Sequence, residues 1–361
     1  MTTKPALYAV ILAGGGGTRL WPLSRQRLPK HLLALCSDRT LLAQTYERIE
    51  PLVSADHVLV ITVAEHAAAA RAQLQGLPAG NVVAEPLGRG TGPAVGLMAM
   101  LIHKRDPDAL MISLHADHAI EDEEGFHSVL LAAVEAAKAG HLVTLGITPS
   151  SPQTGYGYIQ RGERIAQMAG HDLYSVSRFT EKPDRQTAAA FVQTGHYYWN
   201  SGIFVWRPSA LLAEIRRQRP RLYAQLQALE PALDTAFQNA EIERVWREVE
   251  SVSVDVGVME GAADVAMLPA NIGWSDVGSW SSVASQAQAD GDGNVLLGEH
   301  LALDCNDTYI YSSGRLVAAL GLEGMVVIET EDAVLVCPKE RAQEVRTVVT
   351  TLKRQGRERY L

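Results

Sequence analysis

Unbroken apolar runs alternate with Ala-rich stretches of helical character through the first half of this chain, and this alternation most constrains its fold. The apolar runs lie at 6–12, 58–63, 81–84, 109–114 and 142–147, and the helical stretches at about 41–50, 65–75, 91–103 and 124–138. Such runs are typical of strands buried on both faces, and their alternation with helices indicates right-handed βαβ units. The pattern predicts a Rossmann-like, doubly wound α/β sheet, which binds ligands beyond the carboxyl ends of its strands.

The remainder of the chain predicts a mixed sheet followed by a small C-terminal β-rich segment. In the middle region we expect strands at 157–160, 176–180 and 203–206, and helices at 184–194, 208–217, 221–250 and 279–288. A Gly- and Asp-rich break at 289–294 predicts a boundary between a domain at 1–288 and a segment at 289–361. Short strands are expected there at 295–297, 308–311, 316–320, 325–329 and 333–336, then a final helix at 339–354 and a solvated basic tail at 353–359.

Composition excludes several classes of protein. With 32 Lys and Arg against 41 Asp and Glu, the net charge is −9, so a nucleic-acid partner is not expected. Hydrophobic residues make up 47% of the 361 residues, which argues against disorder. Cys36, Cys305 and Cys337 are far apart, so neither a disulfide framework nor a cysteine zinc site is expected. The sequence shows no secretory or membrane-spanning segment, and we expect a cytoplasmic protein without a membrane partner.

A glycine-rich loop follows the first apolar run and predicts a phosphate site. Such glycines let backbone N–H groups approach an anion, and nearby cations such as Arg19 and Lys30 suit phosphate. A dinucleotide fingerprint fails because Arg19 stands where its third glycine should be, and a Walker A loop fails because the chain has no Gly-Lys pair. A nucleotidyltransferase loop and a simple tight turn both remain. The loop consists of Gly14, Gly15, Gly16, Gly17, Thr18 and Arg19.

Residues 14–30 read GGGGTRLWPLSRQRLPK, which we call the signature loop. This segment resembles the G-G-x-G-T-R-L-W-P-L-S-R-x-x-x-P-K signature of the mannose-1-phosphate guanylyltransferases, which are sugar-nucleotide pyrophosphorylases. The resemblance implies a nucleotidyltransferase that forms GDP-mannose and pyrophosphate from GTP and mannose 1-phosphate. It implies in-line attack by the sugar phosphate, assisted by Mg²⁺, with Arg19 and Lys30 as catalytic cations.

Two further segments resemble nucleotide and metal motifs of this family. The segment with Glu85, Pro86, Arg89 and Thr91 resembles E-P-x-x-R-N-T-A-P, which implies contacts near the nucleotide base, although Gly90 and Gly92 replace the usual Asn and Ala. A strand-to-helix turn is the simpler interpretation of that segment. Asp117 in His115–His118 and Asp276 in the WSDVGSW segment resemble the two magnesium carboxylates. Read alone, Asp117 fits a turn or helix cap and Asp276 fits a helix N-cap. His115 and His118 could indicate a zinc site, but no third ligand is evident and structural roles fit them better.

The sugar-phosphate half of the site is implied by four later motifs. These are the GYGYI, FTEKP, WNSG and D-x-x-V-M-E segments, the third of which resembles the family's sugar-binding turn. Lys182 would pair with the sugar phosphate, and carboxylate and amide groups would bind the hydroxyls. Asp255 fits a helix N-cap about as well. The residues implied are Gly157, Glu181, Lys182, Asn200, Ser201 and Asp255.

Two rival functions stay open, and a third activity that some relatives have, isomerisation, is not expected. The chain could serve another nucleotide and sugar 1-phosphate pair, or it could be a non-catalytic subunit that senses sugar nucleotides. Some relatives carry an additional isomerase domain, but no histidine follows His300, so isomerase activity is not expected. The family also suggests a homodimer.

Overall fold

The structure is a computed structural model that describes residues 5–35 and 37–361, so Cys36 lies outside the described residues. The chain divides into two compact units. The first, here called the sheet unit, comprises residues 1–14, 45–116 and 120–274. The second, here called the C-terminal unit, comprises residues 15–44, 117–119 and 275–361. The linear boundary expected after residue 288 stays a prediction.

The sheet unit is built on a mixed nine-stranded sheet in the order β3-β2-β1-β4-β8-β5-β9-β7-β6. The first four strands run parallel, as the apolar runs predict, with β1 between β2 and β4. Strand β8 is antiparallel to both β4 and β5, whereas β5 and β9 are parallel. The strands are β1 (Leu7–Ala13), β2 (Val58–Val63), β3 (Val82–Glu85), β4 (Leu110–His115), β5 (Leu142–Ile147), β6 (Tyr158–Met168), β7 (His171–Thr180), β8 (Tyr197–Trp206) and β9 (Val265–Ala270).

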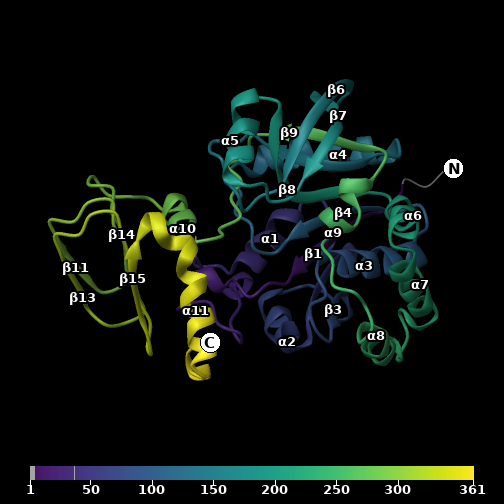
Figure 1. The fold of residues 1–361 in the computed structure, drawn as a ribbon. Coiled ribbons are helices and arrows are strands. Elements are labelled where there is room, and N and C mark those ends of the chain that lie inside the picture. The colour runs from purple at the N-terminus through teal and green to yellow at the C-terminus, as the bar shows by residue number, and fades with distance from the viewer. Residues whose placement is uncertain (1–4, 36) are drawn as a thin grey trace. The chain divides into compact units, whose positions relative to one another are not determined.

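Helices cover this sheet because its strands bury residues on both faces. Tyr8, Val10 and Leu12 of β1 belong to a core cluster with α3, whereas Ala9 and Ile11 between them are also fully buried. The wholly apolar centre of α3 explains how it can pack against β1 while α6 and α7 pack on it (Figure 1). The helices are α1 (Leu41–Ile49), α2 (Ala64–Gln73), α3 (Thr91–Arg105), α4 (Glu123–Lys138), α5 (Arg185–Thr194), α6 (Pro208–Gln218), α7 (Pro220–Leu229), α8 (Gln238–Trp246) and α9 (Val254–Gly257).

The middle region differs from the sequence expectation in two places. The polar stretch 221–250 is two helices, α7 and α8, joined by a short 3₁₀ turn at Glu230–Ala232 that contains Pro231. A proline cannot supply the N–H that a continuous helix needs, which accounts for the interruption. Strand β9 was not expected, because the run AMLPA contains a proline that argues against a strand.

The C-terminal unit contains short parallel strands stacked as a small solenoid. Strands β10, β12 and β14 pair in parallel, β11 pairs with β13 in the same sense, and β15 closes one edge antiparallel. The repeat was missed in the sequence because the successive turns share spacing but no evident motif. The elements are β10 (Val295–Leu297), β11 (His300–Leu303), β12 (Tyr309–Ser312), β13 (Val317–Leu320), β14 (Met325–Glu329), β15 (Val334–Pro338), α10 (Trp280–Gln286) and α11 (Val345–Arg354).

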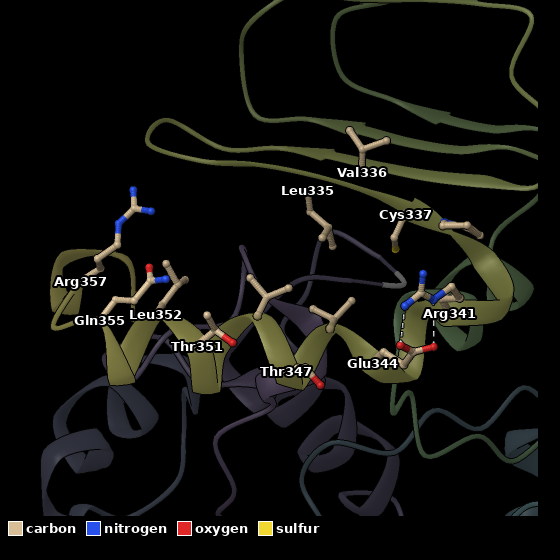
Figure 2. Close-up of a pocket in the computed structure, with 13 residues that line it drawn as sticks. Leu335, Val336, Cys337, Arg341, Glu344, Thr347, Thr351, Leu352, Gln355 and Arg357 are labelled. Carbon is tan, nitrogen blue, oxygen red and sulfur yellow. Dashed lines mark hydrogen bonds and ion pairs between the residues drawn. The ribbon is translucent and has the colours of Figure 1, made fainter.

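The final helix of this unit lies beside β15 and is separated from it by a groove. The helix expected at 339–354 is a 3₁₀ segment at Lys339–Glu344 followed by α11. Figure 2 shows Leu335 of β15 directed toward α11 and Val336 directed away from it, in accord with exposures of 6% and 57%. Together these elements line a groove of about 540 Å³. Among the described residues, no helix has the length and apolar character needed to cross a membrane.

Candidate active site

The glycine loop presents bare backbone immediately after β1. Gly15 and Gly17 have φ of +99° and +57°, a region that favours glycine. A Cβ added to Gly17 would lie 2.6 Å from the Cβ of Lys30 and 2.8 Å from the Oγ of Ser24, so only glycine fits there. At Gly14 and Gly15 an added Cβ would meet no atom within 4 Å. The loop therefore has open space around its backbone, as an anion nest requires.

Lys30 brings together three of the residues implied by the family motifs, all within the C-terminal unit. Its side chain is buried, and its Nζ donates to Oδ2 of Asp117 over 2.8 Å. The same ammonium donates to the main-chain carbonyl of Asp276. Residues 30, 117 and 276 are far apart in sequence, so their convergence on one ammonium is a property of the fold. Asp117 lies in a turn after β4, as its sequence context allowed, and it also serves as an ion-pair partner of Lys30.

Asp276 lies in a tight turn before α10. Its Oδ1 accepts a hydrogen bond from the N–H of Gly278 over 3.1 Å, and the N-cap position of α10 belongs to Ser279. The N-cap alternative for Asp276 is therefore wrong. Val277 lies between Asp276 and Gly278 in this turn. Its φ of +45° is strained for a β-branched residue, and its side chain is fully buried. Burial of this valine fixes the turn, and strained positions of this kind gather at functional sites.

The acidic groups of this cluster suit a divalent cation. Asp117 contacts the ammonium through its carboxylate and Asp276 through its main-chain carbonyl, and both residues carry the carboxylate oxygens that hard cations such as Mg²⁺ prefer. The possible ligand atoms of His115, Asp117 and His118 lie within 4.8 Å of one another. The Asp117 side chain is 23% exposed, so its oxygens are open to solvent while one of them holds Lys30. The donor chemistry therefore fits the metal role that the motifs imply.

In the sheet unit, the loop after β3 is held by its own side chains. The Arg89 guanidinium donates to the carbonyls of Trp246 and Arg247, and the Thr91 hydroxyl accepts the N–H of Val254. These contacts give both residues a structural role, and their contact with a nucleotide stays a prediction.

Two glycines in the same loop permit a close backbone approach. A Cβ at Gly90 or Gly92 would lie 2.6 or 2.9 Å from the carbonyl oxygen of Val252. The N–H of Gly92 donates to that oxygen over 2.9 Å, and the N–H of Val252 donates to the carbonyl of Arg89 over 3.0 Å. The close approach of the Val252 carbonyl thus explains why Gly90 and Gly92 stand where the family pattern has Asn and Ala.

Glu85 is a buried carboxyl at the end of β3. Its Oε2 accepts the indole N–H of Trp246 over 3.0 Å. Burial raises the pKa of Glu85 from 4.5 to about 7, although hydrogen bonds from Trp246 and the backbone of Arg89 act to lower it. Trp246 was missed in the sequence, since nothing in the polar helix around it marks it as a partner of Glu85.

This pKa predicts a pH-dependent stability that Glu85→Gln removes. The folded protein binds the Glu85 proton more tightly than the unfolded chain, so the free energy of unfolding falls as pH rises from 4.5 to about 7. The expected loss from this group is on the order of 3 kcal/mol. Urea unfolding of the wild type and Glu85→Gln at pH 5 and pH 8 measures this loss. The contributions of all other titrating groups cancel when the two proteins are compared at the same pH. A difference that is the same at both pH values would contradict the assignment.

A polar cluster around Asn200 forms the second group of implied residues. The Asn200 Nδ2 donates to Oδ1 of Asp255 over 2.8 Å, and its Oδ1 accepts the N–H of Gly202 over 3.1 Å. A Cβ at Gly157 would lie 2.6 Å from Oε2 of Glu181 and 3.3 Å from the Cβ of Asn200, so glycine is needed for these groups to meet. The cluster therefore gathers one amide and two carboxylates in the sheet unit.

Two expectations about this cluster are corrected. The WNSG segment is part of strand β8, where the pairing with β5 shifts register near Gly202, and it is not a turn. Ser253 caps α9 by accepting the N–H of Val256, so the N-cap alternative for Asp255 is wrong. Ser201 is buried and donates to the carbonyl of Leu145, which gives it a structural role. Its contact with a sugar stays a prediction.

Lys182 and Glu181 pair at the edge of this cluster. Their side chains form an ion pair, and the Lys182 backbone has a φ of +46°. Burial raises the pKa of Glu181 above its ordinary value, while Lys182 acts to lower it and the carboxylates of Asp255 and Glu260 act to raise it. Glu260 accepts the backbone N–H of Glu181 over 3.3 Å.

Comparison with known families identifies both parts of the chain. Residues 8–293 match the nucleotidyl transferase family model, and residues 298–352 match a model described as a mannose-phosphate isomerase/GMP-like β-helix domain. The second match agrees with the parallel stacking of β10, β12 and β14.

Individual relatives agree with these matches over nearly the full chain. A mannose-1-phosphate guanylyltransferase of Escherichia coli is 42% identical over 98% of this chain and 75% of its own length. The xanthan biosynthesis protein XanB of Xanthomonas campestris is 42% identical over 96% of this chain and 73% of its own length. A Thermus thermophilus crystal structure described as a mannose-1-phosphate geranyltransferase aligns with a TM-score of 0.87 and 35% identity, covering 96% of this chain and 99% of that one. The chain therefore belongs to the nucleotidyl transferase family, among the mannose-1-phosphate guanylyltransferases.

Proposed function

We propose that this protein transfers a guanylyl group from GTP to α-D-mannose 1-phosphate and releases GDP-mannose and pyrophosphate. The observation that carries the proposal is the convergence of Lys30, Asp117 and Asp276 beside the glycine loop of the C-terminal unit. These residues supply the charges that a reaction between two phosphorylated anions needs. The names of the relatives supply the choice of base and sugar.

In the C-terminal unit, the glycine loop and its cations would act on the triphosphate. The N–H groups of Gly15–Gly17 would bind phosphate oxygens, while Arg19 and Lys30 balance the negative charge of the leaving pyrophosphate. An oxygen of the sugar phosphate attacks the α-phosphorus in line, and the bond to pyrophosphate breaks. The reaction needs no covalent enzyme intermediate, so catalysis rests on positioning and charge.

Enzymes of this family generally use a divalent metal, and we infer that Mg²⁺ is the ion used here. Asp117 and Asp276 would hold it. When bound, Mg²⁺ supplies positive charge that offsets the repulsion between the phosphates. Lys30 would then hold Asp117 in place through the ion pair already seen in the structure.

In the sheet unit, separate groups would bind the base and the sugar phosphate. Glu85, Pro86, Arg89 and Thr91 would form the base loop. Asn200, Asp255 and Glu181 would bind sugar hydroxyls, because Asn200 is bonded to Asp255 and the Glu181 carboxylate also lies against Gly157. Lys182 is 62% exposed, so it is available to pair with the sugar phosphate.

Asp255→Asn is expected to raise KM for mannose 1-phosphate about tenfold, the effect of losing a charged hydrogen-bond acceptor. KM for GTP should stay within about twofold, because the change leaves the phosphate-binding groups intact. Steady-state kinetics with each substrate varied in turn measures both constants. Asp264→Asn is the matched control, because Asp264 lies in the same unit and contacts His141 on the surface. Equal changes in both KM values would remove Asp255 from the sugar site.

Pyrophosphate release with Mg²⁺ tests the proposed function as a whole. Mannose 1-phosphate and glucose 1-phosphate would each be combined with GTP, ATP, UTP and dTTP. Release confined to GTP with mannose 1-phosphate is the expected result. Release with another pair would keep the reaction and change its substrates, whereas binding of sugar nucleotides without any release would indicate a sensing subunit. A homodimer and a cytoplasmic location stay proposals that the family suggests.

A further inference from the structure

The signature loop is bonded to residues from the far end of the chain. The indole N–H of Trp21 donates to the carbonyl of Tyr360 over 2.7 Å, and the indole N–H of Trp280 donates to the carbonyl of Trp21 over 2.9 Å. Trp280 is fully buried and Trp21 is 7% exposed. These bonds fix both the side chain and the backbone of Trp21. Although the tail 353–359 is exposed as expected, Tyr360 and Leu361 pack against the core of the C-terminal unit.

A second attachment lies four residues further along the loop. Arg25 forms a two-pronged ion pair with Asp332, with Nη2 to Oδ1 at 2.6 Å and Nη1 to Oδ2 at 3.3 Å. The guanidinium also lies over the ring of Trp21 at 5.6 Å and donates through Nε to the carbonyl of Pro22. Arg25 therefore links the turn before β15 to the first attachment at Trp21.

The glycine loop is coupled to this anchored stretch through Ser24. The Ser24 hydroxyl donates to the carbonyl of Gly16 over 2.8 Å, and its N–H donates to the carbonyl of Leu20 over 3.0 Å. Ser24 stands between Trp21 and Arg25 in the sequence. A shift of either attachment therefore changes the position of a residue that holds the glycine backbone.

Close packing alone does not hold the loop in place. A cavity of about 280 Å³ separates Gly16, Trp21 and Ser24 from Val349 and Thr350 of α11. Helix α11 also lines the groove toward β15, and Val348 is one of the residues that line this groove. Besides the packing of Leu20 and Trp21, directional bonds to Tyr360, Trp280 and Asp332 hold the loop.

We infer that Asp332 and Trp280 are positioning residues that hold the signature loop in its triphosphate-binding conformation through Arg25 and Trp21. This inference rests on the proposed function and adds Trp280 of α10 and Asp332 of the turn before β15 to it. Loosening either attachment lowers the fraction of molecules with a competent loop, and the apparent affinity for nucleoside triphosphate falls by the same fraction.

Asp332→Asn is the leading test, with Glu331→Gln as its neighbouring control of equal charge change. Asp332→Asn is expected to raise both the Kd and the KM for GTP about fivefold, as the loss of a partly exposed ion pair allows. KM for mannose 1-phosphate should stay within about twofold. Trp280→Phe keeps an aromatic ring but loses the indole N–H. It should likewise raise the Kd and KM for GTP and leave the KM for mannose 1-phosphate nearly unchanged. Glu331→Gln and Val348→Ala should leave the Kd and the KM for GTP unchanged.

A double-mutant cycle separates loop positioning from a general loss of stability. If Arg25 and Asp332 act through their pair, Arg25→Gln with Asp332→Asn should be no worse than the more severe single change. The exchanged pair Arg25→Asp with Asp332→Arg should recover part of the GTP affinity. The inference would be overturned if the effects of the two single changes on GTP affinity multiplied in the double variant. Equal changes in the KM of both substrates would also overturn it.

Equilibrium binding distinguishes this inference from the proposed function. Titration with GTP in the presence of Mg²⁺ needs no turnover. A wild type that binds no nucleoside triphosphate would overturn the proposed function. A wild type that binds GTP, with an unchanged Kd in Asp332→Asn and Trp280→Phe, would overturn only the positioning role.

Discussion

Asp276→Asn is expected to lower kcat at least ~100-fold, the scale of losing one electrostatic stabiliser. The substitution removes a charge from the proposed metal site but keeps an oxygen that can accept the N–H of Gly278. The turn and the buried side chain of Val277 are therefore retained, and the thermal midpoint should change little. Pyrophosphate release at increasing Mg²⁺ concentrations, together with a melting curve, measures both effects.

The control for this change is Asp307→Asn in the same unit. Asp307 is 69% exposed and pairs with Lys339, so its loss should alter neither kcat nor the dependence on Mg²⁺. Turnover of Asp276→Asn close to that of the wild type at saturating Mg²⁺ would remove Asp276 from the metal site. A large fall in the melting temperature would instead support a structural role for its turn.

Lys30→Met is expected to slow turnover by about 100-fold or more, because it removes the cation that both implied metal carboxylate residues contact. Methionine has similar length, so the buried stem still fills its space against Gly17. Asp117 loses its partner but keeps contact with solvent, which limits the loss of stability. Single-turnover release of pyrophosphate at saturating GTP separates slow chemistry from weak binding.

Lys104→Met provides the comparison for a lysine with a purely structural role. Lys104 Nζ donates to the carbonyls of Glu230 and Leu233 and so ties α3 to the turn after α7. Its loss should lower the melting temperature and leave kcat unchanged. If Lys30→Met melts early while its residual turnover per folded molecule stays normal, Lys30 belongs to the same structural class.

Much of the fold could be predicted because buried strands and helices impose their own patterns. The run at 58–63 matches β2 residue for residue, and the expected helix at 124–138 matches α4 within a residue at its start. Strand β9 escaped because Pro269 counts against a strand, and β11 escaped because HLAL is short and exposed. Sequence periodicity reports burial, so elements with little burial or with a proline leave a weak signal.

The candidate site was predictable only at the level of motifs. The signature loop and the two aspartates were identified by resemblance, but no pattern shows that Lys30 contacts the backbone of residue 276. The N-cap positions at Ser253 and Ser279 were also missed, since a nearby aspartate is an equally good cap by composition. Hydrogen-bond partners distant in sequence depend on tertiary packing, which a single sequence does not reveal.

The division of the chain into units has a consequence for its synthesis. The signature loop is translated well before its core partners Val345 and Leu352 and the acceptor at Tyr360, which lie more than 300 residues further along the chain. The loop must therefore remain without its native surroundings while about 300 further residues are made, at ribosomal rates for tens of seconds. During this time Leu20 and Trp21 are exposed apolar side chains. The loop can therefore take the conformation proposed to bind nucleotide only after residues 345–360 have been made.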